Sequence, residues 1–235
     1  MHVRDIVFSY PGQGEALTGL SADIHSGVTL LVGPNAGGKT TLLRLLAGLL
    51  SPFSGKVVHA PDETELTPAR LRQMSRMVMQ DADPQILGAD VAEDVMLGKA
   101  ASNLGDRFDA EARRLLADFG LDGLWHAPVA SLSYGQKRKL CLVHALLAGP
   151  RMLLLDEPFA GLDYPSAKEL RLFIRESRRN GLAQVITSHE LEPVYDLADR
   201  VVVVDNGRVA VEGEPADLLP DLGQWSVRAP GKGWE

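Results

Sequence analysis

The sequence predicts an α/β protein with a mostly parallel core sheet, an N-terminal antiparallel β-subdomain and an inserted helical subdomain. Three observations support this prediction. Continuous apolar runs, typical of strands buried on both faces, alternate with helical patterns at both ends of the chain. Two stretches of alternating apolar residues near the start predict antiparallel strands. From about residue 81 to residue 150 the pattern is mostly helical.

The first part of the chain begins with strands. DIVFSY and LSADIH predict the antiparallel pair, and VTLLVG predicts a doubly buried strand. The helix GKTTLLRLLAGLL follows and should end before Ser51-Pro52, because proline cannot continue a helix. KVVHA and RMVMQ are predicted strands, and Thr67-Pro68 between them predicts a helix start.

The later part contains two helices and then returns to α/β alternation. One helix is predicted over residues 107–119, ended by Gly120, and a second over GQKRKLCLVHALLAG. The strands MLLLDE, AQVIT, RVVVVD and RVAVEG are predicted next, with an Asn206-Gly207 hairpin turn before the last of them. Helices are expected over residues 166–179 and 190–198.

These patterns predict one domain over residues 1–219. Residues 1–80 and 151–219 would form the core with its antiparallel subdomain, and residues 81–150 the helical subdomain. Residues 220–235 form a short tail with too few apolar residues for a further domain, and we expect it to be loosely ordered or held only by its tryptophans.

Composition excludes several classes of protein. The chain has 235 residues, 45% of them hydrophobic, which is enough for a real core. A net charge of −7 argues against a nucleic-acid-binding protein, because such proteins spread a basic face over phosphates. The apolar runs fall short of the roughly 20 residues that span a bilayer, so we expect any membrane role to come through a partner. Cys141 should be a buried core thiol. No functional role is expected for the histidines at 2, 25, 59, 126 and 144.

The segment GPNAGGKT follows a predicted buried strand and opens a helix, which is the context of a phosphate-binding loop. Backbone N–H groups would hold the β-phosphate, Lys39 would neutralise the β- and γ-phosphates, and the Thr40 hydroxyl would bind Mg²⁺. The alternative is an ordinary strand–helix turn. The predicted nucleotide-binding residues of this segment are Gly33, Pro34, Asn35, Ala36, Gly37, Gly38, Lys39, Thr40 and Thr41.

Two acids follow the apolar strand of MLLLDEP. Parallel strands bring their carboxyl ends to one edge of the sheet, so Asp156 and Glu157 should lie near the phosphate loop. Asp156 would hold Mg²⁺ through water, and Glu157 would polarise the water that attacks the γ-phosphate. The alternative is a pair of exposed carboxylates at a strand end.

The segment LSYGQKRKL places Lys137, Arg138 and Lys139 in the first turn of a predicted helix. A helix N-terminus already carries a partial positive charge, which disfavours cations by about 0.3–1 kcal/mol each unless an anion compensates. We therefore expect an anion near the start of this helix. For each of the three cations, a solvated or structural role is the alternative.

Together these motifs resemble the nucleotide-binding subunit of ATP-binding-cassette (ABC) transporters, whose signature turn is usually LSGGQ. The resemblance runs from about residue 3 to residue 218. It implies a P-loop ATPase that uses ATP and Mg²⁺ and pairs head to tail with a second ATPase subunit, as a homodimer or with a paralogue. The signature helix of one subunit would then face the γ-phosphate held by the other, through Ser133, Gly135 and Gln136.

The resemblance implies four further site residues. Tyr10 is similar to the aromatic that stacks on adenine, with simple packing as the alternative. Gln80 resembles the glutamine that joins the two lobes and senses Mg²⁺ and the attacking water. Asp163 resembles the loop residue that crosses the dimer interface, and His189 the histidine that bonds the γ-phosphate. For His189 the alternative is a helix start with a capping box between Thr187 and Glu190.

Two residues depart from the family pattern. Ala36 stands where the family usually has glycine, and if this position needs a positive φ, alanine costs about 1–2 kcal/mol. Tyr134 replaces the first glycine of LSGGQ, so its side chain must point away from the phosphate or block it.

Residues 80–98 resemble the corresponding segment of cobalt- or nickel-type and energy-coupling-factor importers. This resemblance implies a peripheral protein at the cytoplasmic face of the membrane, with residues 81–97 contacting an integral membrane subunit. Import of a metal ion or a vitamin is the favoured function. A soluble ABC ATPase for cofactor assembly or DNA maintenance and a small-molecule P-loop kinase are the alternatives, although the kinase has no use for LSYGQ.

Overall fold

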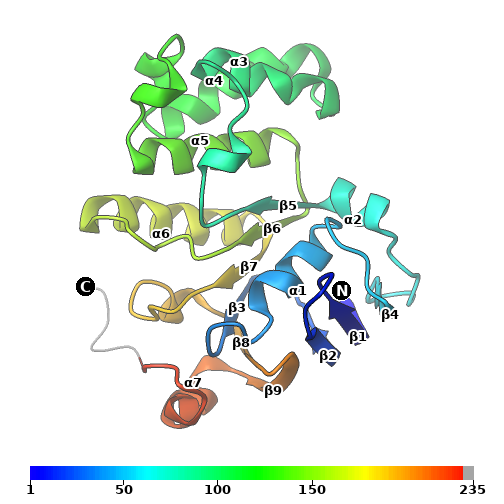
Figure 1. Cartoon of the computed structure of the whole chain (residues 1–235). Coiled ribbons are helices and arrows are strands. Elements are labelled where there is room, and N and C mark those ends of the chain that lie inside the picture. Colours follow the sequence, from blue (N-terminus) through cyan, green and yellow to red (C-terminus); the bar gives the residue numbers. More distant parts are fainter. Residues whose placement is uncertain (230–235) are drawn as a thin grey trace. The chain divides into compact units, whose positions relative to one another are not determined.

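The computed structural model describes residues 1–229, which form two compact units. The first unit contains Met1–Met77 and the described residues from Arg151 on, and the second contains Val78–Pro150. Figure 1 shows the helices and strands of both units.

The first unit contains a three-stranded antiparallel sheet in the order β2-β1-β4. Its strands are β1 (His2–Ser9), β2 (Glu15–Asp23) and β4 (Ser54–Val58). The predicted antiparallel pair is therefore confirmed. Inward-facing residues of β1 and β2 alternate with more exposed ones, and Val3, Ile6 and Leu17 are fully buried. Burial of one face only explains why these strands alternate in sequence.

A six-stranded sheet in the order β5-β6-β7-β3-β8-β9 forms the centre of the fold. Its strands are β3 (Val28–Val32), β5 (Ser75–Val78), β6 (Met152–Leu155), β7 (Ala183–Thr187), β8 (Arg200–Asp205) and β9 (Arg208–Gly213). The pairs β6–β7, β7–β3 and β3–β8 are parallel, whereas β8–β9 is an antiparallel hairpin. The loops after β3, β6 and β7 therefore leave the sheet at one edge.

The helices of the first unit are α1 (Lys39–Leu46), α2 (Pro68–Met74), α6 (Tyr164–Arg179) and the short α7 (Pro215–Leu218), with 3₁₀ turns η6 (Tyr195–Leu197) and η7 (Leu219–Trp225). Both α1 and α6 pack against the central strand β7. As predicted, α2 starts at Thr67-Pro68, with the Thr67 hydroxyl accepting from Arg70 N. The sequence predicted that α1 would extend to Leu50. The helix ends at Leu46 instead, because Gly48 takes a left-handed conformation at φ +67°.

The second unit is helical. It contains α3 (Val91–Leu97), α4 (Phe108–Asp118) and α5 (Tyr134–Leu147). Short 3₁₀ turns connect them: η1 (Asp83–Gln85), η2 (Lys99–Ala101), η3 (Gly105–Arg107), η4 (Asp122–Leu124) and η5 (Val129–Ser131). Fully buried Phe108, Val95 and Leu140 bring the three helices around one core. The ends predicted for α4 and α5 are confirmed, since Gly120 and Gly149 both have positive φ.

Two expectations about the C-terminal part are wrong. The helix predicted over residues 190–198 is absent, and only the 3₁₀ turn η6 forms there, because Pro193 cannot donate a helical hydrogen bond. The tail is not loosely ordered over its described part, since Leu222 and Val227 are buried. Trp225 is only half-buried, so leucine and valine hold the tail; Trp234 lies outside the described residues.

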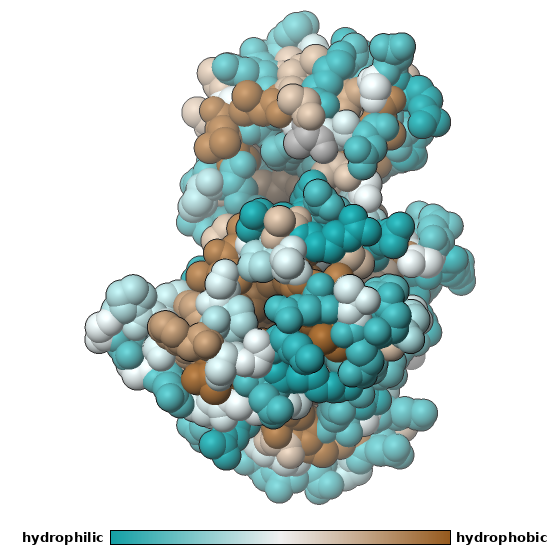
Figure 2. Space-filling view, turned by 90° about the vertical axis from the view of Figure 1, so that its right-hand side faces the viewer, coloured by the Kyte–Doolittle hydropathy of each residue, from teal (hydrophilic) through white to brown (hydrophobic). Residues whose placement is uncertain are grey.

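On the face displayed in Figure 2, hydrophilic residues predominate and hydrophobic residues gather in small groups. Within residues 1–229, no helix combines the length and the apolar character that crossing a bilayer requires.

Candidate nucleotide-binding site

The loop after β3 forms an open helix N-terminus. Gly38, at φ +109°, precedes α1, and no side chain caps the helix there. The loop also lies against the end of β8: a Cβ on Gly33 would meet Val204 O at 2.1 Å, and one on Gly37 would meet it at 2.7 Å. The sequence therefore needs glycine at both positions to bring the loop onto the sheet. Uncapped N–H groups and the helix dipole make this turn a receptor for an anion.

Ala36 occupies the left-handed region, with φ +59°. This position therefore does need a positive φ, which is the condition under which alanine is costly there. Alanine tolerates that conformation at a cost of about 1–2 kcal/mol relative to its preferred regions. The phosphate loop of this chain is thus more strained than one with glycine.

The Lys39 side chain is bonded to the backbone of the phosphate loop itself. Its Nζ donates hydrogen bonds to Gly33 O and to Pro34 O, both at 2.8 Å, and the side chain is buried. Burial lowers the pKa of Lys39, and the nearby carboxylates of Glu157 and Asp156 partly offset this effect. A positive charge is therefore held over the loop where a phosphate would replace two carbonyl oxygens as its partner.

The acids after β6 reach the same edge of the sheet. Thr40 Oγ1 donates to Asp156 Oδ1 at 3.1 Å, which brings the first turn of α1 to the strand end. Thr187, at the end of β7, donates to the same Asp156 oxygen at 2.7 Å and accepts from Glu157 N at 2.8 Å. This one hydroxyl joins both acids.

Glu157 has a strained backbone and a partly satisfied carboxylate. Its φ is +48°, which is rare for a residue with a Cβ and typical of functional sites. Oε2 accepts from His189 N at 3.0 Å, while buried Oε1 lies 3.3 Å from His189 Nε2 without a hydrogen bond between them. Burial raises the pKa of Glu157, and the adjacent His189 opposes the increase. A raised pKa suits a carboxylate that accepts a proton near neutral pH.

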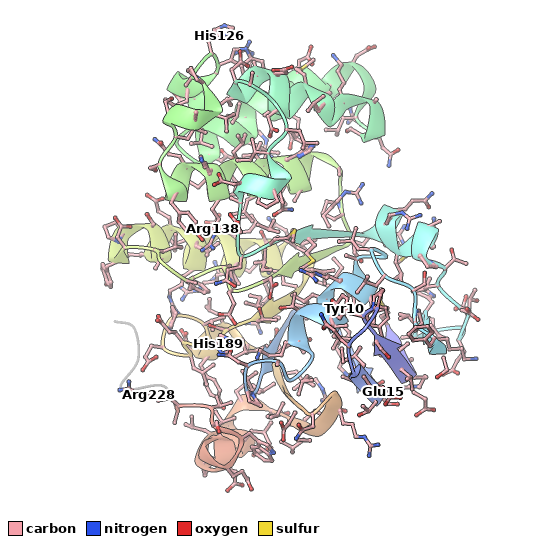
Figure 3. The ribbon with its side chains drawn as sticks, in the orientation of Figure 1. Tyr10, Glu15, His126, Arg138, His189 and Arg228 are labelled. Atoms are coloured by element: carbon pink, nitrogen blue, oxygen red, sulfur yellow. The ribbon has the colours of Figure 1, made fainter. Side chains whose placement is uncertain are left out.

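The capping-box alternative for His189 is wrong. No helix starts at this position, and the Thr187 hydroxyl is bonded to Asp156 and Glu157 instead of to a helix N–H. His189 is half exposed and follows the end of β7 (Figure 3). Thr187, which bonds to both acids, is a residue of this candidate site that the sequence did not single out. The available signal was a polar side chain at the carboxyl end of a buried strand beside the acid pair.

Tyr10 lies just past the end of β1, and other side chains hold its ring (Figure 3). Arg44 Nη1 donates to the Tyr10 hydroxyl at 3.0 Å, and Thr41 Oγ1 lies 3.4 Å from it. The Phe8 ring packs edge-on at 5.0 Å. A half-buried aromatic ring is therefore tied to α1, the helix that carries the phosphate loop.

The signature turn lies in the second unit and is closed by its own side chains. Ser133 caps α5: its Oγ accepts from Gln136 N at 3.2 Å, and Gln136 Oε1 accepts from Ser133 N at 2.8 Å. Gly135 lies inside this first turn. The helix begins at Tyr134, so Lys137 and its neighbours come just after the first turn, not within it as predicted.

The basic residues after the signature turn have partners within their own unit. Lys137 Nζ lies 2.6 Å from Asp83 Oδ1, and Arg138 Nη2 donates to Gln80 O at 2.7 Å. These contacts agree with the structural alternative for the cations. Gln80 therefore lies beside α5, with its carbonyl bonded to that helix.

The comparisons with known proteins point to one family. The ABC transporter family matches residues 17–160. The cobalt import ATP-binding protein CbiO of Rhodobacter capsulatus is 38% identical to this chain, over 96% of the chain and 83% of the relative. The chain belongs to the ABC transporter family. It is an ATPase whose hydrolysis is coupled to transport.

Further relatives and solved structures agree with membership of the ABC transporter family. The energy-coupling factor transporter protein EcfA of Methanothermobacter thermautotrophicus is 31% identical over 98% of this chain and 76% of the relative. The structure of cbiO1 from Clostridium perfringens, part of the cbiONQ complex, has a TM-score of 0.81 and 30% identity, covering 94% of this chain and 90% of that one. An ATP-binding cassette in its ADP conformation also has a TM-score of 0.81, with 26% identity over 96% of both chains. The fold class predicted from the sequence is confirmed.

The donors in this ABC ATPase fit Mg²⁺. Within residues 1–229 there is no group of three or more His, Cys, Asp or Glu side chains that could hold a metal ion by itself. Mg²⁺ on nucleotides, however, usually binds one or two protein oxygens together with phosphates and waters. The Thr40 hydroxyl and the Asp156 carboxylate, 3.1 Å apart, supply that pair of oxygens.

The remaining predicted residues lie on the surfaces of their own units. Asp163 caps α6, its Oδ1 accepting from Ser166 N at 3.0 Å. In the segment 81–97, Leu87 is 76% exposed and Leu97 is 51% exposed. Both leucines are thus available at the surface of this segment.

Proposed function

We propose that this chain is the ATPase of an importer, that it closes with a second ATPase subunit around ATP and Mg²⁺, and that it drives uptake of cobalt, nickel or a vitamin. The uptake would proceed through a separate membrane subunit. Three similarities support the substrate class: the curated relatives are named for cobalt import and for energy coupling, and the cbiO1 structure belongs to cbiONQ.

Binding of ATP would use the open start of α1. The triphosphate would take the Lys39 ammonium from Gly33 O and Pro34 O and would accept bonds from the loop N–H groups. The remaining phosphate-loop residues, Pro34, Asn35 and Thr41 among them, would shape this receptor, and Tyr10 would lie against adenine. Mg²⁺ held by Thr40 and Asp156 would neutralise charge on the phosphate oxygens.

Hydrolysis would use Glu157 as the base. A water oxygen attacks the γ-phosphorus, the bond to the β–γ bridging oxygen breaks, and the water proton passes to the Glu157 carboxylate. ADP and phosphate leave. Thr187 supports this role because it fixes Glu157 N, and His189 because its backbone holds Oε2. The observation that carries the proposal is the Thr187 bridge between Asp156 and Glu157 beside the Lys39 loop.

The partner subunit would complete the site. Ser133, Gly135 and Gln136 of one chain would contact the γ-phosphate held by the other, while Gln80 would contact Mg²⁺ and the attacking water and Asp163 the dimer interface. We propose that residues 81–97 contact the membrane subunit, which would place the chain peripherally at the cytoplasmic face. The exposed Leu87 and Leu97 support this contact.

A test uses Glu157→Gln with Glu190→Gln as the matched control. Glu190 is exposed and lies outside the acid pair. We expect Glu157→Gln to bind ATP, to lose hydrolysis and to accumulate as an ATP-dependent dimer in size-exclusion chromatography, whereas Glu190→Gln behaves as wild type. Normal hydrolysis by Glu157→Gln, or wild-type hydrolysis by a strict monomer at every protein concentration, would contradict the proposal.

The substrate class needs its own measurement. Co-purification with an integral membrane protein, lost in Leu87→Glu, would support the transporter partner. Uptake of Co²⁺, Ni²⁺ or a vitamin by proteoliposomes holding the complex would then identify the class. A chain that copurifies with no membrane protein would favour the soluble ABC ATPase instead.

A further inference from the structure

The backbone at Gln80 is attached to α5 by two side chains from the first two turns of that helix. The Tyr134 hydroxyl donates to Gln80 O at 2.9 Å, and Arg138 Nη2 donates to the same oxygen at 2.7 Å. The two bonds join positions 54 and 58 residues apart in the chain. Both lone pairs of the Gln80 carbonyl are thereby used by one helix.

Tyr134 and Arg138 also contact each other, so the three residues form a closed triangle. Arg138 Nη2 donates to the Tyr134 hydroxyl at 2.7 Å, and the guanidinium lies over the Tyr134 ring, 4.9 Å from its centre. Arg138 is only 3% exposed and projects from α5 away from the core shared with α3 and α4 (Figure 3). A buried guanidinium requires such partners, because burying a charge without them is costly.

The next residues of the segment are attached to α5 as well. Lys137 pairs with Asp83, and the Cys141 thiol lies 3.8 Å from Ala82 O. Four side chains of α5 between Tyr134 and Cys141 therefore contact the segment from Gln80 to Asp83. The attachment starts at Gln80 and continues toward the exposed Leu87.

We propose that Tyr134 and Arg138 are positioning residues for Gln80, which make the signature turn and the Gln80 segment move as one body. This inference rests on the proposed role of Gln80 in hydrolysis. Simple packing of the Tyr134 ring does not explain the contacts, because the residue remains 44% exposed and its hydroxyl is the group that bonds. The tyrosine that departs from LSGGQ thus supplies a bond that glycine lacks.

The inference predicts a particular kinetic change. Tyr134→Phe keeps the ring over Arg138 but removes the hydroxyl, so Gln80 loses one of two attachments. We expect kcat for ATP hydrolysis to fall by about threefold to tenfold, with KM for ATP within twofold, since one hydrogen bond is lost while the phosphate-loop donors stay unchanged. Arg138→Met should give a larger loss of kcat. The Mg²⁺ concentration that gives half-maximal activity should rise in both.

Arg113→Met is the matched control. Arg113 lies over the Trp125 ring at 4.2 Å, so it forms the same kind of arginine–aromatic pair in the same unit without contacting the Gln80 segment. We expect its kcat and its Mg²⁺ dependence to equal those of the wild type. Circular dichroism melting of each variant separates loss of folding from loss of positioning.

A double-mutant cycle with Gln80→Ala decides the question. If Tyr134 acts through the Gln80 side chain, Tyr134→Phe should have no further effect on kcat in the Gln80→Ala background. Additive losses, or a Tyr134→Phe variant with wild-type kcat and Mg²⁺ dependence, would overturn the inference while leaving the ATPase mechanism intact. A Gln80→Ala variant with normal hydrolysis would instead overturn the proposed role of Gln80.

Discussion

The helices α1 and α5 both begin at a turn that the sequence predicts to meet phosphate, yet the two starts are built differently. At α1, Gly38 leaves the helix without a side-chain cap, and the Lys39 ammonium is bonded to the loop carbonyls. At α5, Ser133 and Gln136 cap the turn reciprocally. The first start is open toward a ligand, whereas the second already satisfies the N–H groups of Ser133 and Gln136.

This difference indicates how the two sites would bind phosphate. An open turn with a lysine can bind an anion in a single chain, because no side chain caps its N–H groups and Lys39 gives up only its bonds to two loop carbonyls. A capped turn must exchange internal bonds for phosphate bonds, which makes it a weak receptor alone. The phosphate loop therefore suits the primary binding of ATP, and the signature turn suits contact with a phosphate that is already bound.

The largest effect should come from removing the charge at the open turn. Lys39→Met should weaken ATP binding by on the order of 100-fold, because charge-assisted bonds to phosphate are lost. Isothermal titration calorimetry on the isolated chain measures this. Lys137→Met, which removes a lysine near the start of α5, should leave the affinity within twofold. Equal losses in both variants would erase the distinction between the two turns.

Opening the capped turn should have a smaller effect, on hydrolysis instead of on binding. Ser133→Ala should lower ATP hydrolysis about tenfold and destabilise the chain by about 1 kcal/mol, the usual value of an N-cap. Its ATP affinity as a monomer should not change. Asp90→Ala removes the cap of α3, where Asp90 accepts from Glu93 N at 2.8 Å, and should match the loss of stability without the loss of hydrolysis in the isolated chain. Weaker ATP binding by monomeric Ser133→Ala would contradict the comparison.

Glu157, the acid beside the open start of α1, should lower the free energy of unfolding of the chain in the absence of ATP. Because burial raises the pKa of Glu157 above its ordinary value of 4.5, the unfolded chain loses this proton first as the pH rises. Wild-type stability is then lost between that value and the folded-state pKa. Glu157→Gln avoids the loss, so it should melt higher at pH 8, by about 2–4 °C if 1 kcal/mol is gained.

Thermal melts of wild type and Glu157→Gln at pH 5 and pH 8 test this expectation. The difference in melting temperature should be smaller at pH 5. A difference that grows toward low pH would show that the ionised carboxylate is favoured by its surroundings, contrary to its burial.

The smallest effect concerns the strain at Ala36. Ala36→Gly relieves about 1–2 kcal/mol of left-handed strain but gives the unfolded chain more freedom, so the net gain in stability should be at most about 1 kcal/mol. ATP affinity should stay the same or rise by a few-fold. At the next position, Gly37→Ala should destabilise the loop because its Cβ would meet Val204 O at 2.7 Å. Tenfold weaker ATP binding by Ala36→Gly would disprove the strain argument.

Much of the fold follows from sequence because local patterns determine it. Doubly buried β3 is apolar except for Thr29 and β6 is entirely apolar, and Gly120 and Gly149 end their helices as glycines in left-handed conformations usually do. The missing helix after His189 shows the limit. Thr187 and Glu190 have the spacing of a capping box, but Thr187 is needed by acids 30 and 31 residues away. A local pattern cannot reveal a distant competitor for the same hydroxyl.

The site shows the same limit. The sequence predicted that Lys39, Asp156 and Glu157 lie at one edge of the sheet, because each comes after a buried strand that fixes where the chain emerges, and the structure brings them together there. It did not identify the bonds from Tyr134 and Arg138 to Gln80, because these join positions more than fifty residues apart through a side chain that departs from the family pattern. The sequence indicated that Ala36 would be strained only if its φ is positive, and the structure shows that this φ is positive.

Cys141, the single cysteine, can report on opening of the packing around α5. It is 6% exposed on α5, and burial raises the pKa of its thiol to about 12, so almost no thiolate exists at neutral pH. Because the thiol is buried and lies against Ala82 O, a reagent would react with it when the packing around this part of α5 opens. The rate of alkylation at this one sulfur atom would therefore measure how often the packing around this part of α5 opens.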